Sequence, residues 1–140
     1  MNIDSITKGV VIDHIEAGKG MEIVRLLNLE KLTCPVAVIR NARSGKTGKK
    51  DIIKIEDKVD IDLDVLGFID PNITVNIIEK EHIVEKKRMA PPSEIVNVVQ
   101  CKNPRCVTSV ERGLKQVFRR VEGSAVYRCA YCEQEYQPVK

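Results

Sequence analysis

Hydrophobic residues in the first part of the chain recur with two different periods. Apolar residues at helical spacing occur in residues 20–28 and 62–69. The β-branched or alternating apolar pattern of a strand occupies residues 8–15, 36–39, 51–56, 73–78 and 82–84. The order along the chain is therefore β-α-β-β-α-β followed by a final strand. This order predicts an α+β fold of the ferredoxin-like type, an antiparallel sheet with two helices on one face.

A glycine-containing loop, residues 43–50, separates the second and third strand-like runs. Its glycines, Gly45 and Gly48, permit positive φ angles, so we expect the flanking runs to pair as an antiparallel hairpin. The string Gly45-Lys46-Thr47 resembles part of a phosphate-binding P-loop. However, residues 36–43 lack the earlier glycine of that motif, and the loop leads to a strand instead of a helix. We therefore interpret it as a solvated hairpin loop.

The periodic pattern breaks at two adjacent prolines, Pro91 and Pro92, because proline lacks a backbone donor and excludes a helix. We place a domain boundary there, so that residues 1–90 form the ferredoxin-like domain and residues 91–140 form a second, β-rich domain. In the second domain, residues 93–100 read as a strand. Residues 109–128 fit either a basic helix or a hairpin that turns at residues 122–124, and we prefer the hairpin, as in small zinc ribbons.

Four cysteines near the C-terminus form two close pairs, Cys101 with Cys106 and Cys129 with Cys132, and 22 residues separate the pairs. Each pair is short enough for one loop to present both sulfurs to one ion, so the spacing predicts a tetrahedral Cys₄ zinc site, one Zn²⁺ per chain. Four protein ligands leave no position for water or substrate, which indicates a structural metal. Two disulfides, or four unconnected thiols, are the other interpretations of the same residues.

The formal net charge of +3 lies entirely in residues 91–140, since residues 1–90 carry fifteen basic and fifteen acidic side chains. A zinc ion on four thiolates adds −2 and leaves a weak positive field, which argues against nucleic acid as a partner. The N-terminal residues do not resemble a signal peptide and no apolar run is long enough to span a membrane, so we expect a cytoplasmic protein with reduced thiols. Cys34, the fifth cysteine, is expected to be a small apolar core residue.

Three polar residues lie within predicted strands. Period-2 alternation places Lys54 on the face opposite Ile53 and Ile55, where a solvent-facing lysine is the ordinary explanation. Asp13 and His14 are neighbours on one strand, so they should point to opposite faces unless the strand is twisted or at an edge, and a catalytic dyad is not expected.

The strings around these residues, taken together, resemble the regulatory chain of aspartate carbamoyltransferase. They are residues 9–15, 48–56 and 74–76, followed by Lys86 and the two cysteine pairs, in the right order over nearly the whole chain. The resemblance implies a ferredoxin-like allosteric domain in residues 1–90 that binds CTP or ATP, with UTP as a further candidate. It also implies a zinc domain in residues 91–140 that contacts the catalytic chain, and a homodimer of regulatory chains.

The resemblance also implies roles for single residues. Asp13 and Lys54 would contact the ribose and the base, His14 and Lys86 the phosphates, and Asn76 the ribose region. The base pocket would be lined by Ile6, Ile78, Glu81 and Ile83, with Lys50 and Asp4 as outer contacts. The best-known members carry a tyrosine at the base site, where this chain has Glu81.

The leading interpretation is therefore a non-catalytic regulatory subunit of pyrimidine biosynthesis. A zinc-ribbon protein that binds nucleic acid is the first alternative, and a small zinc or thiol enzyme is the second. The closed Cys₄ site and the lack of a paired nucleophile and base argue against the enzyme interpretation.

Overall fold

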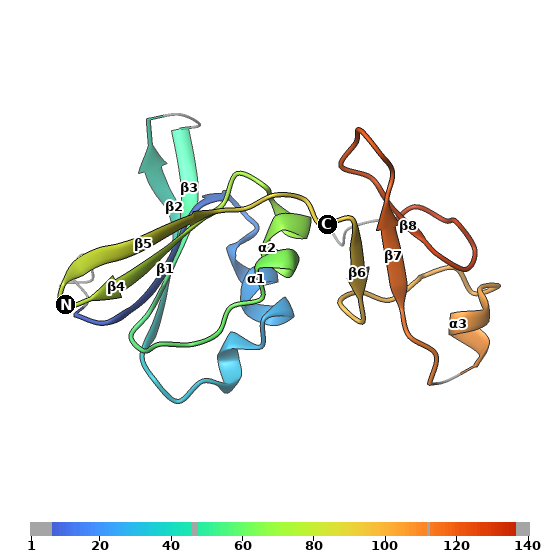
Figure 1. Ribbon diagram of the computed structural model, residues 1–140, viewed down its shortest axis with the longest axis horizontal. Helices are drawn as coiled ribbons and strands as arrows, with labels where there is room; N and C mark the ends of the chain where they lie inside the picture. The colour runs from blue at the N-terminus through green and yellow to red at the C-terminus, as the bar shows by residue number, and fades with distance from the viewer. Residues whose placement is uncertain (1–6, 46–47, 112, 137–140) are drawn as a thin grey trace. The chain divides into compact units, whose positions relative to one another are not determined.

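The computed structural model describes residues 7–45, 48–111 and 113–136 (Figure 1). The chain forms two compact units, Met1–Ala90 and Pro91–Lys140. Asp4 and Ile6, two of the expected binding residues, lie outside the described residues, as do Lys46 and Thr47 of the glycine-containing loop. No helix in the described part of the chain is long and apolar enough to span a membrane.

The first unit is a five-stranded antiparallel sheet with two α-helices on one side of it (Figure 1). The strands lie in the order β2-β3-β1-β4-β5. The predicted ferredoxin-like fold with one further strand is confirmed, and a short 3₁₀ helix, Leu29–Lys31, follows the first helix. In chain order the main elements are β1 (Gly9–Glu16), α1 (Gly20–Leu26), β2 (Val36–Ser44), β3 (Gly48–Ile55), α2 (Leu63–Ile69), β4 (Thr74–Glu79) and β5 (His82–Arg88).

The core of this unit forms where the alternating strand residues meet the helices. Ile12 of β1 and Ile53 of β3 are fully buried, and so are Ile23 of α1 and Leu66 of α2. Full burial of one such side chain contributes about 1.5–3 kcal/mol, so these contacts decide which face of each strand turns inward. The intervening residues, among them Lys54, therefore lie on the opposite face, which we call the open face.

Local sequence signals explain where α2 begins and ends. The Asp62 carboxylate accepts hydrogen bonds from the backbone N–H groups of Asp64 and Val65, at 3.0 and 3.3 Å, and so caps the helix. The helix stops at Ile69, just before Asp70 and Pro71.

Two β-bulges interrupt the sheet at one end. The register between β1 and β3 shifts between Ile12 and Ile15, and the register between β2 and β3 shifts between Ile39 and Ala42. A bulge adds one residue to one strand and redirects the side chains around it.

The second unit contains a three-stranded antiparallel sheet in the order β6-β7-β8. Its elements are β6 (Glu94–Val96), α3 (Val107–Val110), β7 (Val117–Arg120) and β8 (Tyr127–Cys129). The preferred hairpin is confirmed, because Arg120 pairs with Tyr127 across the turn. The single strand expected over residues 93–100 is wrong beyond Val96: Asn97 has a φ of 58° and exchanges hydrogen bonds with Gln116, which ends the ladder. The short helix α3 was not predicted.

Candidate metal centre and candidate binding face

The four cysteine sulfurs of the second unit converge on one point. All four Sγ atoms lie within 4.8 Å of one another. Cys101 Sγ is 3.6 Å from Cys132 Sγ, and Cys106 Sγ is 3.7 Å from Cys129 Sγ. A tetrahedron of sulfurs around Zn²⁺ with bonds of about 2.3 Å has edges of about 3.8 Å. A disulfide would bring two sulfurs to about 2.05 Å. The cluster therefore fits a structural zinc site and excludes both the disulfide interpretation and that of four unconnected thiols.

Each cysteine occupies a position that the fold fixes. Cys101 and Cys106 lie in the loop between β6 and α3, while Cys129 ends β8 and Cys132 lies in the turn that follows. The side chains of Cys106 and Cys129 are each only 1% exposed, and Thr108 Oγ1 lies 3.0 Å from Cys106 Sγ. The closed, all-sulfur donor set is typical of structural zinc, since no coordination position remains for a substrate.

The thiols differ in acidity before a metal binds. Burial raises the pKa of Cys101 to about 12 and also raises the pKa of Cys129. A hydrogen bond from the backbone N–H of Gln134 lowers the pKa of Cys132 to about 7. Zinc binding near neutral pH must therefore displace protons from the buried thiols, because thiolates are the ligands.

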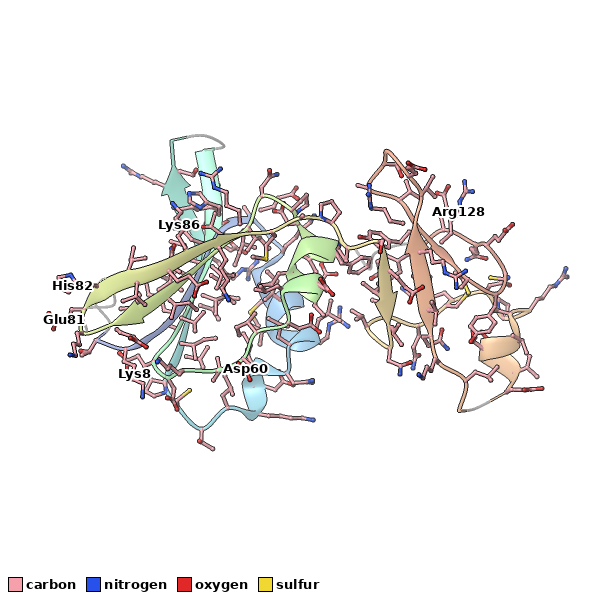
Figure 2. The ribbon with its side chains drawn as sticks, viewed as in Figure 1. Lys8, Asp60, Glu81, His82, Lys86 and Arg128 are labelled. Atoms are coloured by element: carbon pink, nitrogen blue, oxygen red, sulfur yellow. The ribbon has the colours of Figure 1, made fainter. Side chains whose placement is uncertain are left out.

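On the open face of the first unit, residues from four adjacent strands form one row. Lys54 of β3 lies opposite Val11 of β1, Val11 lies opposite Asn76 of β4, and Asn76 lies opposite Lys86 of β5. Residues directly opposite in antiparallel strands point to the same face. The row thus brings together Lys54, Asn76 and Lys86, three of the expected binding residues, across about 14 Å of sheet. Figure 2 shows Lys86 on β5.

Asn76, in the middle of this row, holds an unsatisfied acceptor. Its Oδ1 atom is buried, with no hydrogen-bond partner among the described residues. A buried acceptor without a donor costs free energy, and so favours a ligand that supplies one. This is the feature of the row that most clearly points to a ligand.

The next residues along the open face form a tighter polar cluster at the bulged end of the sheet. Lys50 Nζ lies 3.0 Å from Asp13 Oδ1, and both side chains are about four-fifths buried. The backbone N–H of His14 donates to Asp13 Oδ1 at 2.6 Å, while its ring Nδ1 lies 2.9 Å from Thr74 Oγ1. The expectation that Asp13 and His14 point to opposite faces is wrong. The bulge gives His14 a φ of 58° and turns its ring to the same face as Asp13.

A pocket of about 1170 Å³ lies beside this cluster. Three expected binding residues line it, namely His14, Lys50 and Lys86. Arg88, Lys49 and Ser44 also line it, and none of these three residues is among the binding residues expected from the resemblance. Period-2 alternation was the available signal for Arg88, because it is two residues from Lys86 on the same strand and therefore shares its face.

The remaining expected residues do not line the pocket. Asp13, Lys54 and Asn76 lie on the adjoining sheet face. Ile78 and Ile83 lie opposite each other across β4 and β5, towards the far end of the strands. Glu81 lies in the tight turn between these strands with a φ of 66°, and its N–H donates to the carbonyl oxygen of Thr7 (Figure 2). The open face therefore runs from the apolar pair Ile78 and Ile83 near the hairpin, through the row of Asn76, to a basic pocket.

Both units match domains of one known protein family. Residues 1–90 match the family described as aspartate carbamoyltransferase regulatory chain, allosteric domain, and residues 93–139 match the metal binding domain of the same chain. The regulatory chain of Clostridium botulinum (strain Hall) is 52% identical over 137 residues, 97% of this chain and 94% of that protein. That of Clostridium acetobutylicum is 51% identical, covering 100% and 97%. That of Bifidobacterium longum is 46% identical, covering 96% and 98%.

Proposed function

Because the chain belongs to the family of aspartate carbamoyltransferase regulatory chains, we propose that residues 1–90 bind CTP or ATP on the open face. We further propose that residues 91–140, with zinc on the four cysteines, dock onto the catalytic chain. As a member of this family the chain is a non-catalytic subunit in pyrimidine biosynthesis. Neither the enzyme interpretation nor the nucleic-acid alternative is favoured by this membership.

Apolar, polar and basic side chains follow one another along the open face, and this order supports one orientation for the nucleotide. The base lies towards the hairpin, near the apolar pair Ile78 and Ile83 and the main chain at Glu81. The sugar lies over the row, where Lys54 and Asn76 meet it and Asp13 accepts from its hydroxyl groups. The phosphates enter the basic pocket, where His14 and Lys86 contact them and Lys50 is an outer contact. The observation that carries this proposal is the unsatisfied Oδ1 of Asn76, which lies between two lysines in one cross-strand row.

Calorimetric titration of CTP, ATP and UTP into the full zinc-loaded chain tests the proposal directly. We expect saturable binding of at least one of the three with one site per chain. Absence of binding at millimolar nucleotide would overturn the assignment of residues 1–90 as a nucleotide-binding domain and leave a subunit that serves assembly alone.

Arg88 provides a sharper test of where the phosphates lie. Arg88→Ala is expected to weaken CTP or ATP binding by about tenfold, since one charge-assisted contact to a phosphate contributes roughly 1.5–3 kcal/mol and this side chain is exposed. Lys87→Ala is the matched control: Lys87 lies opposite the buried Val75, on the other face of the same strand. Titration of CTP and cytidine should show a loss for CTP alone. Equal affinities in both variants would place the phosphates elsewhere.

The homodimer is also a proposal. The sheet of the first unit ends in β2 and β5, and each has one unpaired edge among the described residues. Such edges in a small domain are readily covered by a twofold mate. We expect sedimentation of the isolated chain at tens of micromolar to give twice the mass of one chain, whereas a monomer would count against pairing outside the full complex.

Exposed apolar side chains on the second unit support its proposed contact with the catalytic chain. Val107 and Val110 of α3 are 41% and 72% exposed, and Tyr131, between two of the cysteines, is 46% exposed. Apolar groups gathered near a metal-held loop are typical of a protein interface. Zinc would then act on assembly by fixing α3 and the turn that carries Tyr131.

A further inference from the structure

We infer that Asp51 is a positioning residue. It holds His14 and Lys50 in place at the basic end of the open face and does not itself contact a ligand. Its carboxylate is fully buried, on the helix side of β3. That it serves a nucleotide site rests on the proposed function, whereas its effect on His14 and Lys50 does not.

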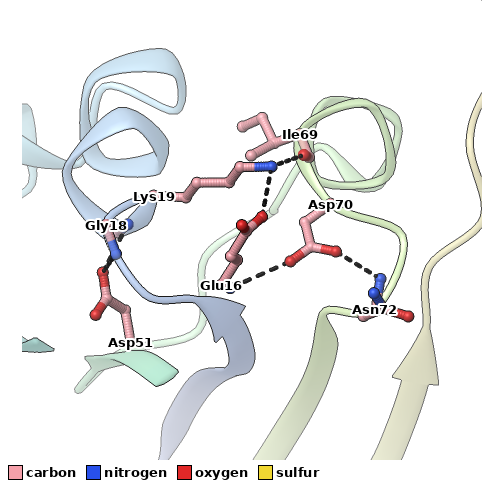
Figure 3. A network of polar contacts seen from close by, with 8 residues as sticks. Glu16, Gly18, Lys19, Asp51, Ile69, Asp70 and Asn72 are labelled. Carbon is pink, nitrogen blue, oxygen red and sulfur yellow. Dashed lines mark hydrogen bonds and ion pairs between the residues drawn. The ribbon is translucent and has the colours of Figure 1, made fainter. Parts of the chain in front are cut away.

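Three backbone N–H groups from two different segments donate to the Asp51 carboxylate. Oδ2 accepts from Gly18 at 3.1 Å and from Gly20 at 3.0 Å, while Oδ1 accepts from Asn41 at 3.0 Å. A buried carboxylate is tolerated only when such donors replace water. Figure 3 shows the bond between Gly18 and Asp51 near a second one, in which Asp70 accepts from Glu16. Asp51 thus ties β3 to β2 and to the turn that leads into α1.

One donor lies inside a bulge, and the other two lie just beyond the end of the other bulged strand. Asp51 pairs with Ile15, the first residue of β1 in register after its bulge. Asn41, with a φ of 59°, lies inside the bulge of β2. Since a bulge leaves a residue out of the ladder, another contact must fix how the strand resumes. The bond to Asn41 provides that contact for β2, and the bonds to Gly18 and Gly20 anchor the turn that follows β1, three to five residues after Ile15.

The bulges in turn place the side chains that line the basic pocket. His14 reaches Thr74 only because the bulge in β1 gives it a positive φ. Lys50 precedes Asp51 on β3, so burial of Asp51 on one face turns Lys50 to the other, where it meets Asp13. A shift of one residue would exchange these faces and move both basic groups away from the pocket.

Gly20 shows how closely the carboxylate is enclosed. A Cβ atom added to Gly20 would lie 2.8 Å from Asp51 Oδ2, closer than real contacts allow. Gly20→Ala therefore displaces the carboxylate without removing its charge. This provides a second variant in case loss of the carboxylate prevents folding.

The primary experiment uses Asp51→Asn in the full zinc-loaded chain. An amide cannot accept on both sides, so at least one of the three backbone bonds is lost. The chain contains two histidines, His14 beside the bulge and His82 at the far hairpin. In NMR spectra the ring resonances of His14 therefore report on the site, and those of His82 serve as an internal reference. We expect the His14 resonances to move while those of His82 stay in place, with the same pattern in Gly20→Ala.

Calorimetric titration of CTP and cytidine adds a second measurement, the affinity for each ligand. Asp51→Asn should weaken CTP binding by about tenfold, the effect of one lost charge-assisted contact, and leave cytidine binding unchanged, because only the phosphate end is displaced. Asp62→Ala is the control for a general loss of stability, since it removes the helix cap of α2 and not a bond at the bulges.

Two results would overturn the inference: His14 resonances that coincide with those of the wild type, or an equal displacement in Asp62→Ala. If the wild-type chain binds no nucleotide, the proposed function fails, and the resonances still decide whether Asp51 positions His14.

Discussion

Replacement of Cys129 by serine is expected to abolish stoichiometric zinc binding and to unfold residues 91–140 locally. Cys129 is 1% exposed, and its sulfur lies 3.7 Å from that of Cys106. The buried apolar residues described in this unit are few, and two of them are cysteines of the cluster: Ile95, Cys106, Phe118, Tyr127 and Cys129. Zinc binding contributes about 10 kcal/mol or more to the folding of such modules, which exceeds what so small a core supplies.

The variant should also fail to associate with the catalytic chain, because helix α3, which carries Val110, and the turn that carries Tyr131 lose their anchor. The first unit should still bind nucleotide, since its core is separate from the zinc module. Metal analysis, sedimentation with the catalytic chain and nucleotide titration measure these three outcomes. Cys34→Ser is the matched control, because Cys34 lies in the first unit outside the cluster. A Cys129→Ser chain that kept one zinc and still assembled would show that the ligand set is wrong.

Replacement of Lys54 by alanine is expected to weaken CTP or ATP binding by about ten- to a hundredfold, the effect of one charge-assisted hydrogen bond. Lys54 is half-buried on the open face, in the row that contains Asn76 and Lys86. Folding should be little affected, because the neighbouring Ile53 and Ile55 supply the core contacts of β3. Lys31→Ala removes the same charge at an exposed position away from the row and serves as the control.

In the reconstituted complex, the Lys54→Ala variant should show normal activity without effector and a lost or weakened response to nucleotide. An effector shifts a two-state equilibrium only by binding the two states with different affinity, so loss of binding removes the shift. Assembly should survive because the zinc module makes the proposed catalytic contacts. Activity measured with and without CTP and ATP checks this result. Wild-type affinity in the variant would remove Lys54 from the site.

Much of the fold follows from short-range patterns in the sequence. Alternation around Lys54 placed Ile53 and Ile55 in the core, and the spacing of the four cysteines indicated a zinc site. Both signals are local, since strand period and loop length are properties of a few consecutive residues. The turn signal at residues 122–124 is also local, and it favoured the hairpin of the second unit over a basic helix.

The binding face required information that no local pattern contains. The sequence determined that Lys54, Asn76 and Lys86 stand on strands, but only the pairing register placed them in one row. Asp13 and His14 were assigned opposite faces by alternation, and the bulge put them on the same one. A bulge depends on which groups hold the backbone around it, here the buried carboxylate of Asp51, which accepts from Asn41 in the bulge of β2 and from Gly18 and Gly20 in the turn after β1. Sequence patterns therefore indicated the main elements of the first unit, the metal ligands and the family, while α3, the end of β6 and the set of side chains that meet on the open face depend on the tertiary structure, because register and bulges are settled by long-range hydrogen bonds and burial.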